Sequence, residues 1–516
     1  MSYRAGATPL AGVREWAGLA ILALPTLLVS LDMFVMLLAL PHIGRTLHAS
    51  GVQQLWLLDI YGFMVAGFMI TMGTLGDRLG RRRVLLVGAA VFGLASLAAA
   101  WSTSAAMLIV ARVVLGIAGA ALAPSTLSLI THMFRDPRQR AAALGVWAGC
   151  FTVGAVVGPL VGGVLLERYW WGAVFLLGVP AMLLLLAVGP LVLPEYRDER
   201  AGRLDLPSVA LSLLSVLPLM QAVKSLTRDG ADATSWVLLG VGLVVGVIFV
   251  RRQRRLADPL LDLGLFADRT FGATLGGMLL FSTLSAGTMA LVAQHFQLVN
   301  GLSPLRAGLA LAPGMLASVA GFQLAPVLAR RIRPAYLIAG GMLCTVVGLL
   351  VMTQADTSGT AALIVGFAVT CLGPAPLVTL GTGLVIGAAP PERAGSAAAM
   401  AQTANDFGYA LGVAVLGSVG TAVYRANLPA DAPAAARDSI TGAVEAASRL
   451  PEPAAAPLLA AAHQAFAAGL HLVAALSAVI LIGVAVLLAA VLRHLPPLAP
   501  PPSDRSAEPV PADNVH

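Results

Sequence analysis

Charged side chains stand inside long apolar stretches of this sequence, where an ionised group is costly and calls for an explanation. Asp32, Asp59 and Arg112 belong to the first quarter of the chain, and Asp406 belongs to the last. A carboxylate held near a cation in an apolar setting can bind and release a proton, so Asp32, Asp59 and Arg112 are candidate proton-coupling residues. The alternative is an Asp–Arg pair that only fixes the packing of helices.

Asp406 has polar neighbours at Gln402 and Asn405. Its apolar stretch begins near Ser396, so a helix would carry Asp406 about 15 Å along its axis, close to the middle of a bilayer. An ionised carboxylate at that depth attracts a cationic ligand strongly, because the local dielectric is low. Asp406, Gln402 and Asn405 are therefore candidate substrate-binding residues.

The elements that position these residues are predicted to be membrane-spanning helices, which makes the fold an all-α integral membrane protein. Of 516 residues, 58% are hydrophobic and 11% are charged, whereas a soluble chain has about 25% charged residues. Apolar stretches long enough to cross a bilayer recur fourteen times. They lie at 16–40, 56–72, 84–101, 105–131, 141–165, 172–193, 207–226, 236–250, 271–299, 305–328, 335–353, 360–388, 396–423 and 470–492.

The distribution of arginine predicts how these helices are oriented. An even number of spans places both ends of the chain on one side. Most arginines stand near the N-terminus or in alternate loops, and the opposite short loops hold only Arg45, Arg168, Arg228 and Arg306. Because basic loops stay in the cytoplasm, we expect both termini to be cytoplasmic. Asp32, Asp59 and Arg112 then fall in the outer half of their helices.

The loop between the second and third spans, GTLGDRLGRRR at residues 73–83, packs four arginines and one aspartate into a short turn. Its glycines allow two helix ends to approach closely, and its charges hold the loop in the cytoplasm. A basic loop by itself indicates only on which side of the membrane the loop lies. The full pattern G-x-L-x-D-R-x-G-R-R is a more specific sequence signature than a basic loop. The residues of this pattern are Gly73, Asp77, Arg78, Gly80 and Arg81.

The fifth span contains glycines four residues apart and a proline. Such glycines give a helix a smooth face for close packing, and a proline kinks the helix. The residues of this pattern are Gly154, Gly158, Pro159, Gly162 and Gly163. Packing alone is the usual meaning of a small-residue motif of this kind.

The spans divide into six, two and six. The segment ARRIRP at 329–334 follows the second of the last six spans and is a degenerate copy of the 73–83 loop. This copy indicates two parallel six-helix repeats with a two-helix insertion between them. The predicted units are an N-terminal bundle at 1–195, a linker with two inserted helices at 196–270, a C-terminal bundle at 271–495 with an outward-facing loop at 424–463, and a disordered cytoplasmic tail at 496–516.

Several classes of function are disfavoured by composition. Lys224 is the only lysine, so no phosphate-binding loop of the G-x-x-x-x-G-K-[ST] type can be written and ATP-driven transport is not expected. The arginines lie in loops without interleaved aromatic residues, which argues against nucleic-acid binding. No metal-ligand cluster and no Ser/His/Asp-type constellation is apparent, so we expect neither an enzyme nor a metal or other cofactor beyond protons as the coupling ion.

The charged loop, the glycine pattern of the fifth span, Arg112 and the segment L-D-x-x-x-x-x-x-A-L-P at 31–41 together resemble the fourteen-helix drug:proton antiporter branch of the major facilitator superfamily. Residues 53–61 resemble the quaternary-ammonium-type multidrug efflux pumps within it. The resemblance implies that Asp32 is a proton or cation site with Arg112 as its partner. It also implies that Asp77 is a gating residue, in a gating loop with Gly73, Arg78, Gly80 and Arg81. It implies that the glycine pattern controls alternating access, and it matches Asp406 to a carboxylate of the thirteenth helix.

The sequence departs from this family pattern where relatives that export dications carry further acids. Ser318 and Gln402 stand at those positions, and Leu115 replaces a common glutamine. These departures weaken the case for divalent-cation recognition but not for export.

The expected function is proton-coupled efflux of amphipathic, cationic or neutral, drug-like small molecules across the cell membrane, by a protein that acts as a monomer. A dedicated exporter of one metabolite or antibiotic is the alternative within transport. A membrane sensor that does not transport is the alternative from another class, and the intact charged loop and the intramembrane carboxylates argue against it.

Overall fold

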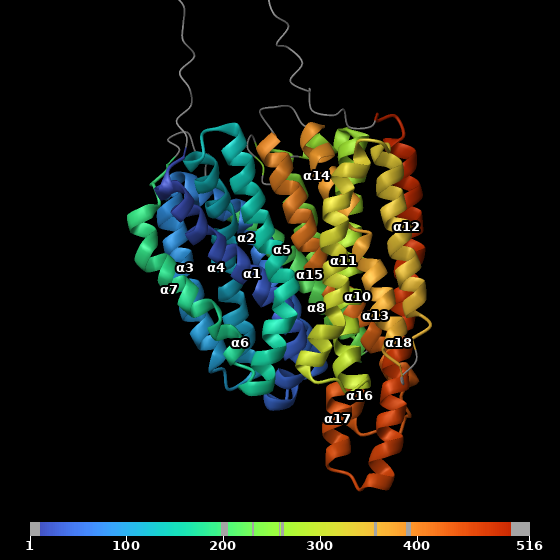
Figure 1. Ribbon diagram of the computed structural model, residues 1–516. Helices are drawn as coiled ribbons and strands as arrows, with labels where there is room; N and C mark the ends of the chain where they lie inside the picture. Colours follow the sequence, from blue (N-terminus) through green and yellow to red (C-terminus); the bar gives the residue numbers. More distant parts are fainter. Residues whose placement is uncertain are drawn as a thin grey trace, which may run out of the picture.

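The computed structural model describes residues 11–197, 205–229, 232–256, 259, 263–355, 359–388 and 394–496, and in these residues every regular element is a helix. The long helices run side by side as one upright bundle (Figure 1). The tail predicted at 496–516 lies outside the described residues except for residue 496, and so does 198–204 of the predicted linker.

The first bundle consists of α1 (Val13–Thr46), α2 (Gly51–Leu79), α3 (Arg81–Ala100), α4 (Ala105–Met133), α5 (Pro137–Arg168), α6 (Ala173–Leu176) and α7 (Gly178–Val192). The inserted hairpin is α8 (Leu206–Asp229) and α9 (Ala233–Gln253), followed by the short 3-10 helix η1 (Leu263–Ala267). The second bundle consists of α10 (Arg269–Gln294) with the π-helical turn η2 (His295–Val299), α11 (Pro304–Ala329), α12 (Pro334–Met352), α13 (Ala361–Leu372), α14 (Ala375–Gly387), α15 (Ala394–Asn427), α16 (Ala434–Asp438), α17 (Ile440–Ser448) and α18 (Glu452–Leu492).

Polar residues at the predicted loop ends fix where several helices begin. A serine or aspartate side chain accepts a hydrogen bond from the backbone N–H three residues later, which satisfies one of the free donors of the first turn. The caps of α2, α4, α9, α10 and α11 are Ser50, Ser104, Asp232, Asp268 and Ser303.

Thirteen segments of the described chain are long and apolar enough to cross a membrane. The 32-residue helix α5 is not among these thirteen, but it runs the full height of the bundle in Figure 1. With α5 the described residues make fourteen passes, so the start of α1 and the end of α18 lie on one side. This side is called the terminal side below, and the side of α16 and α17 is called the far side.

The two bundles repeat one packing scheme. In the first, α1 packs along α5, α2 along α4, and α3 along α4 and α7. In the second, α10 packs along α15, α11 along α13, and α12 along α13 and α18. Each pairing has its counterpart in the other half of the chain, as the prediction of parallel six-helix repeats requires.

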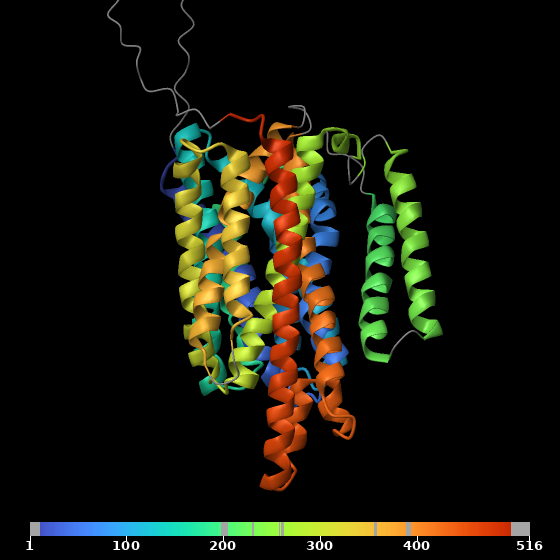
Figure 2. The same cartoon turned by 90° about the vertical axis from the view of Figure 1, so that its right-hand side faces the viewer.

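The bundles meet along two seams, α2 with α15 and α5 with α11. The inserted hairpin lies against the first seam, because α8 contacts both α2 and α15. Figure 2 shows this green helix pair standing beside the bundles. Only 11% of the α9 span is buried, and its exposed Trp236, Val241 and Val247 suit a helix that faces lipid.

Polar contacts tie the two inserted helices together on the terminal side. Arg252 donates from Nη2 to Asp205 Oδ1 at 2.7 Å and from Nε to Ser208 Oγ at 3.0 Å. Partial burial disfavours ionisation of Asp205, but hydrogen bonds from Ser208 and Arg252 outweigh it and hold the pKa of Asp205 below its usual value.

The predicted start of the last helix, residue 470, is wrong. α18 begins at Glu452, so most of the predicted loop 424–463 is helical: α15 continues to Asn427, and α16 and α17 follow. High hydropathy identifies only the part of a helix that lies in the membrane. The alanine-rich segment 453–469 continues the helix beyond it because alanine has a high intrinsic helix propensity. The extension projects from the bundle at the bottom of Figure 1.

The helical segment 434–448, here called the far-side hairpin, contacts the junction of α1 and α2. Asp438 Oδ2 accepts a hydrogen bond from the backbone N–H of Gly51 at 2.7 Å. Glu445 Oε1 lies 3.2 Å from His48 Nδ1. The second bundle therefore reaches across to the first on the far side.

Candidate functional site

Asp32 on α1 and Arg112 on α4 form an ion pair. Arg112 Nη1 lies 2.7 Å from Asp32 Oδ2, and the side chains are 2% and 15% exposed respectively. Withdrawing these charges from water is costly, and direct pairing offsets part of that cost. The structure thus brings together two residues that lie 80 positions apart in the sequence.

Arg112 makes two further contacts, both with α2. Its Nε donates to the carbonyl oxygen of Leu57 at 3.1 Å, and its guanidinium carbon lies 4.8 Å from the centroid of the Tyr61 ring, within range of a cation–π interaction. Both contacts therefore hold the guanidinium of Arg112 against α2.

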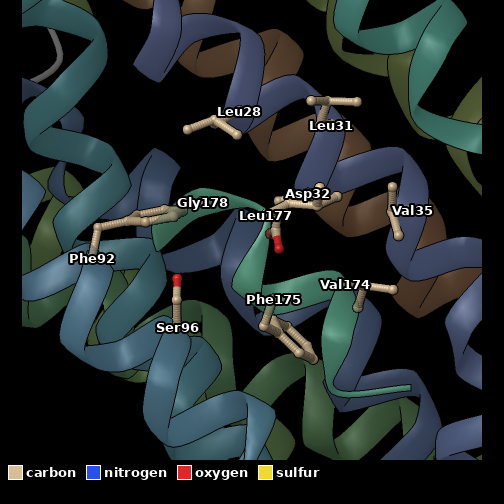
Figure 3. Close-up of a pocket in the computed structure, with 10 residues that line it drawn as sticks. All are labelled: Leu28, Leu31, Asp32, Val35, Phe92, Ser96, Val174, Phe175, Leu177 and Gly178. Atoms are coloured by element: carbon tan, nitrogen blue, oxygen red, sulfur yellow. The ribbon is translucent and has the colours of Figure 1, made fainter. Parts of the chain in front are cut away.

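A small cavity inside the first bundle opens beside Asp32 (Figure 3). Asp32 and Ser96 supply its polar side chains, and the remaining lining is Leu28, Leu31, Val35, Phe92, Val174, Phe175, Leu177 and Gly178. Asp32 thus contacts an opposite charge on α4 and also lines a small cavity.

Asp32 lies deeper than the sequence analysis placed it. α1 continues to Thr46, beyond the predicted end at residue 40. At 1.5 Å per residue, Asp32 is then about 21 Å from the far-side end of its helix. Arg112 lies about 10 Å from the far-side end of α4, the depth that the sequence predicted. Asp59 lies about 12 Å from the far-side end of α2, deeper than predicted, because α2 begins at Gly51.

Asp59 pairs with a residue that the sequence analysis did not consider. Lys224 Nζ on the inserted helix α8 lies 2.7 Å from Asp59 Oδ2, and both side chains are fully buried. The same Nζ lies 3.6 Å from the centroid of the Trp56 ring. The insertion therefore supplies the counter-charge for one of the candidate coupling carboxylates.

The three candidate binding residues of α15 do not share one environment. Gln402 Nε2 donates to Asp406 Oδ1 at 3.0 Å, and Gln402 is exposed while Asp406 is half-buried. Asn405 points elsewhere, because its Oδ1 accepts a hydrogen bond from Ser282 on α10 at 2.9 Å. Only Asp406 and Gln402 therefore form a joint polar surface.

The charged loop between α2 and α3 is tightly packed. Asp77 Oδ1 accepts a hydrogen bond from Arg81 Nε at 2.7 Å, and Arg81 Nη1 reaches the carbonyl oxygen of Pro124 on α4 at 3.5 Å. Gly80 has φ +111°, and a Cβ there would lie 2.5 Å from Glu195 Oε1. In this structure the Asp77 contact joins helices of the same bundle.

The rest of this loop is held from α7. Glu195 Oε1 accepts a hydrogen bond from the backbone N–H of Arg82 at 3.1 Å, and its Oε2 lies 3.9 Å from Arg83 Nε. Gly73 and Arg78 stand in the last two turns of α2.

The glycine pattern of α5 permits backbone contacts with two helices. A Cβ on Gly163 would lie 2.6 Å from the Cα of Leu305 on α11, so α5 and α11 touch across the seam between the bundles. Toward α1, a Cβ on Gly154 would lie 2.7 Å from the carbonyl oxygen of Leu27, and one on Gly162 would lie 2.8 Å from Val35 Cγ1. Gly158 and Pro159 are buried between these positions.

Three residues of the site were missed from the sequence. Lys224 carried a usable signal, because it is an ionisable residue within a predicted span. Tyr61 and Glu195 carried none, since their importance depends on which helices pack together.

Comparisons with known proteins extend over most of the chain. The profile of the Major Facilitator Superfamily matches residues 22–413. The multidrug efflux pump LfrA of Mycolicibacterium smegmatis is 41% identical over 491 residues, covering 93% of this chain and 97% of LfrA.

More distant relatives are resistance and export proteins by name. The methyl viologen resistance protein SmvA of Salmonella typhimurium is 36% identical, covering 88% of this chain and 93% of SmvA. The tetracenomycin C resistance and export protein of Streptomyces glaucescens is 32% identical over 90% of each chain. Among solved structures, a bacterial homologue of the human lysosomal transporter Spinster superposes with a TM-score of 0.69 at 18% identity, covering 94% of this chain and 98% of that one. This last likeness concerns the fold.

Proposed function

Since the chain belongs to the Major Facilitator Superfamily, we propose that it is a proton-coupled exporter of amphipathic drug-like molecules, cationic or neutral. It acts as a monomer in the cytoplasmic membrane and has both termini in the cytoplasm. Protons are its coupling ion. The basic residues support this orientation, because the terminal-side loops hold most of the arginines.

The observation that carries the proposal is the buried Asp32–Arg112 pair, whose Asp32 also lines a small cavity. A purely structural pair would be enclosed by packed apolar side chains on all sides. A pair that faces a cavity can exchange its proton and so change the charge at the centre of the bundle. Arg112 also donates a hydrogen bond to the carbonyl oxygen of Leu57. A change of charge at Asp32 can therefore be transmitted to α2, which is a helix of the seam.

Substrate binding is assigned to the surface formed by Asp406 and Gln402 on α15. A carboxylate that is only half-buried can meet a ligand directly, and the neighbouring amide can donate or accept a hydrogen bond. Asn405 supports this surface from behind through its bond to Ser282. Tyr61 on α2 contacts Arg112, and α2 packs along α15, so binding of a cation at Asp406 and of a proton at Asp32 can influence each other through this seam.

Alternating access is assigned to the two seams and to the charged loop. The far-side contacts of Gly163 with Leu305 and of Asp438 with Gly51 must separate for release to the outside. The Asp77–Arg81 contact stiffens the terminal-side end of α2 and α3.

A dedicated exporter of a single compound is a second candidate. The tetracenomycin C resistance and export protein matches this chain over 90% of its length, and its name states a single compound. A panel of unrelated compounds separates the two candidates, because a multidrug exporter protects against several and a dedicated exporter against one.

The test is a resistance and efflux panel in a cell that lacks its own pumps, with and without a protonophore. We expect protection against several amphipathic compounds, and we expect the protonophore to abolish it. Asp32→Asn should abolish proton-driven efflux, and Asp32→Glu should retain part of it. Proton-driven efflux that survives in Asp32→Asn would show that the carboxylate is structural.

A further inference from the structure

The Asp59–Lys224 pair stands at the junction of three structural units. Asp59 lies on α2 of the first bundle, Lys224 lies on the inserted α8, and α15 of the second bundle packs against both helices. Both charged side chains are fully buried. A buried ion pair is costly to assemble, and breaking it by removing one partner is strongly destabilising.

The contacts around the pair attach the inserted helix to the seam. Trp56 Nε1 on α2 donates to Gln221 Oε1 on α8 at 2.8 Å, one turn before Lys224. Met220 packs with Phe63 of α2 and with Ala410 of α15 in one buried apolar cluster. The inserted helix therefore covers the line along which the bundles must part on the far side.

A second small cavity on the far side is lined by Lys224 of this pair. It is lined by Gly51, Val52, Leu55, Lys224, Thr421, Arg425 and Asp438. Its residues come from α2, α8, α15 and the far-side hairpin, the elements that meet at the outer end of the seam. Water that enters this cavity approaches Lys224, and through it Asp59, without crossing the bundle interior.

The charges in this region balance. Asp32 and Arg112 form one pair and Asp59 and Lys224 form another, and Asp59 also interacts electrostatically with Arg112. A proton bound by either carboxylate therefore leaves one uncompensated positive charge in the group. Other charged or titratable residues on the elements around the pair include Tyr61, Asp77 and Arg78 on α2, Asp406, Tyr409, Tyr424 and Arg425 on α15, Arg437 and Asp438 on α16, and Arg251 and Arg252 at the terminal-side end of α9.

We propose that Lys224 is a positioning residue for proton coupling, and that the Asp59–Lys224 pair is a clasp that a proton from the far side opens. In the closed state Lys224 holds Asp59 ionised and α8 against α2. A proton from water in the far-side cavity binds an Asp59 oxygen, so the ion pair becomes a weaker contact between an ammonium and a neutral acid. The Asp59 O–H bond forms as an O–H bond of a hydronium ion in the cavity breaks, and Lys224 keeps its own proton.

Opening of the clasp has a mechanical consequence. The lysine side chain is long and flexible, and Asp438 lines the same cavity, so the ammonium has a second carboxylate on its far side. Once Lys224 turns outward, α8 loses its charged contact with α2. The α2–α15 seam can then separate on the far side and release the substrate. The inserted hairpin thereby becomes part of the coupling machinery, a role that rests on the proposed proton-coupled export.

The test compares variants in proteoliposomes with an imposed pH gradient and ethidium, a lipophilic monocation, as the probe. Lys224→Met should reduce proton-driven ethidium exchange by about tenfold or more, the change that roughly 1.4 kcal/mol produces. Lys224→Arg should retain much of the exchange because it keeps the charge. The double variant Asp59→Asn with Lys224→Met leaves no buried charge at the pair, so it should fold normally and still show a flattened dependence of exchange on far-side pH.

Gln221→Met is the matched control, because it breaks an uncharged contact between α8 and α2 one turn away. It should keep the wild-type pH profile. Ethidium binding to the purified protein should be unchanged in all variants.

The proposal is overturned if the double variant exchanges ethidium at the wild-type rate with the wild-type pH profile. It is also overturned if Gln221→Met loses as much exchange as Lys224→Met, since the insertion would then act only by packing. If Lys224→Met does not fold, the double variant alone decides. Absence of proton-driven exchange in the wild type would instead refute the proposed function itself.

Discussion

Replacement of Gly163 by alanine tests the role of the glycine pattern most sharply. The added Cβ would lie 2.6 Å from the Cα of Leu305 and 2.9 Å from both the nitrogen of Leu305 and the carbonyl oxygen of Pro304. These are backbone atoms, so no side-chain rotation relieves the clash. Ordinary van der Waals contact begins near 3.4 Å, and α5 and α11 must therefore move about 0.8 Å apart at this point.

The magnitude follows from the cost of overpacking, which is about 1–3 kcal/mol for an added carbon in a tightly packed site. The clash exists only while the two bundles touch on the far side. The ratio of molecules closed on the far side to molecules open on the far side should therefore fall roughly 5- to 150-fold. The two bundles themselves should remain folded, because the added methyl group lies on the seam between them.

The assay measures the distance between spin labels on Arg168→Cys and Arg306→Cys, two exposed positions at the far-side ends of α5 and α11, after replacement of the three native cysteines. Gly163→Ala should shift the distances to longer values and slow export. Gly149→Ala on the same helix is the control, because a Cβ there meets nothing within 4 Å. Unchanged distances and unchanged export in Gly163→Ala would refute the reasoning.

Three further predictions concern the other parts of the site. Asp406→Asn should weaken export of monocations more than export of neutral compounds, and Gln402→Glu should improve export of dications. If the variants affect monocations, neutral compounds and dications equally, Asp406 does not take part in substrate recognition. Asp77→Asn should be expressed normally but transport poorly, since the loop loses a charged contact, and full activity would show that this contact is dispensable. A disulfide between Gly44→Cys and Thr441→Cys should block export until it is reduced, because a Cβ on Gly44 would lie 3.3 Å from Thr441 Cγ2 across the far side. Export that continues with this disulfide formed would mean that the far-side hairpin need not separate from α1.

Much of the fold was predictable because a bilayer imposes strong rules on sequence. Apolar stretches of spanning length located nearly all the helices within a few residues, and the degenerate copy of the charged loop revealed the repeat. The start of α18 was missed because an alanine-rich helix needs no lipid to be stable. Hydropathy alone therefore fails where a helix leaves the membrane.

The sequence identified individual charged residues of the site, but it did not show which residues pair with one another. The cost of burial singled out Asp32, Asp59 and Arg112, yet the Lys224 partner of Asp59 depends on where an inserted hairpin packs, which no local pattern encodes. Helical geometry did separate the residues of α15. Gln402 precedes Asp406 by four residues and shares its face, whereas Asn405 is turned by about 100° and faces α10.

The central claim, that proton binding at Asp32 drives export, is tested most directly by reconstitution. Purified protein would be placed in liposomes that contain ethidium and nucleic acid as a fluorescent reporter, and a pH gradient would then be imposed. The account predicts ethidium movement against its own gradient, driven by proton flow in the opposite direction, and predicts that Asp32→Asn retains ethidium binding but loses the coupled flow. Ethidium movement that ignores the pH gradient, or that persists at full rate in Asp32→Asn, would contradict the account.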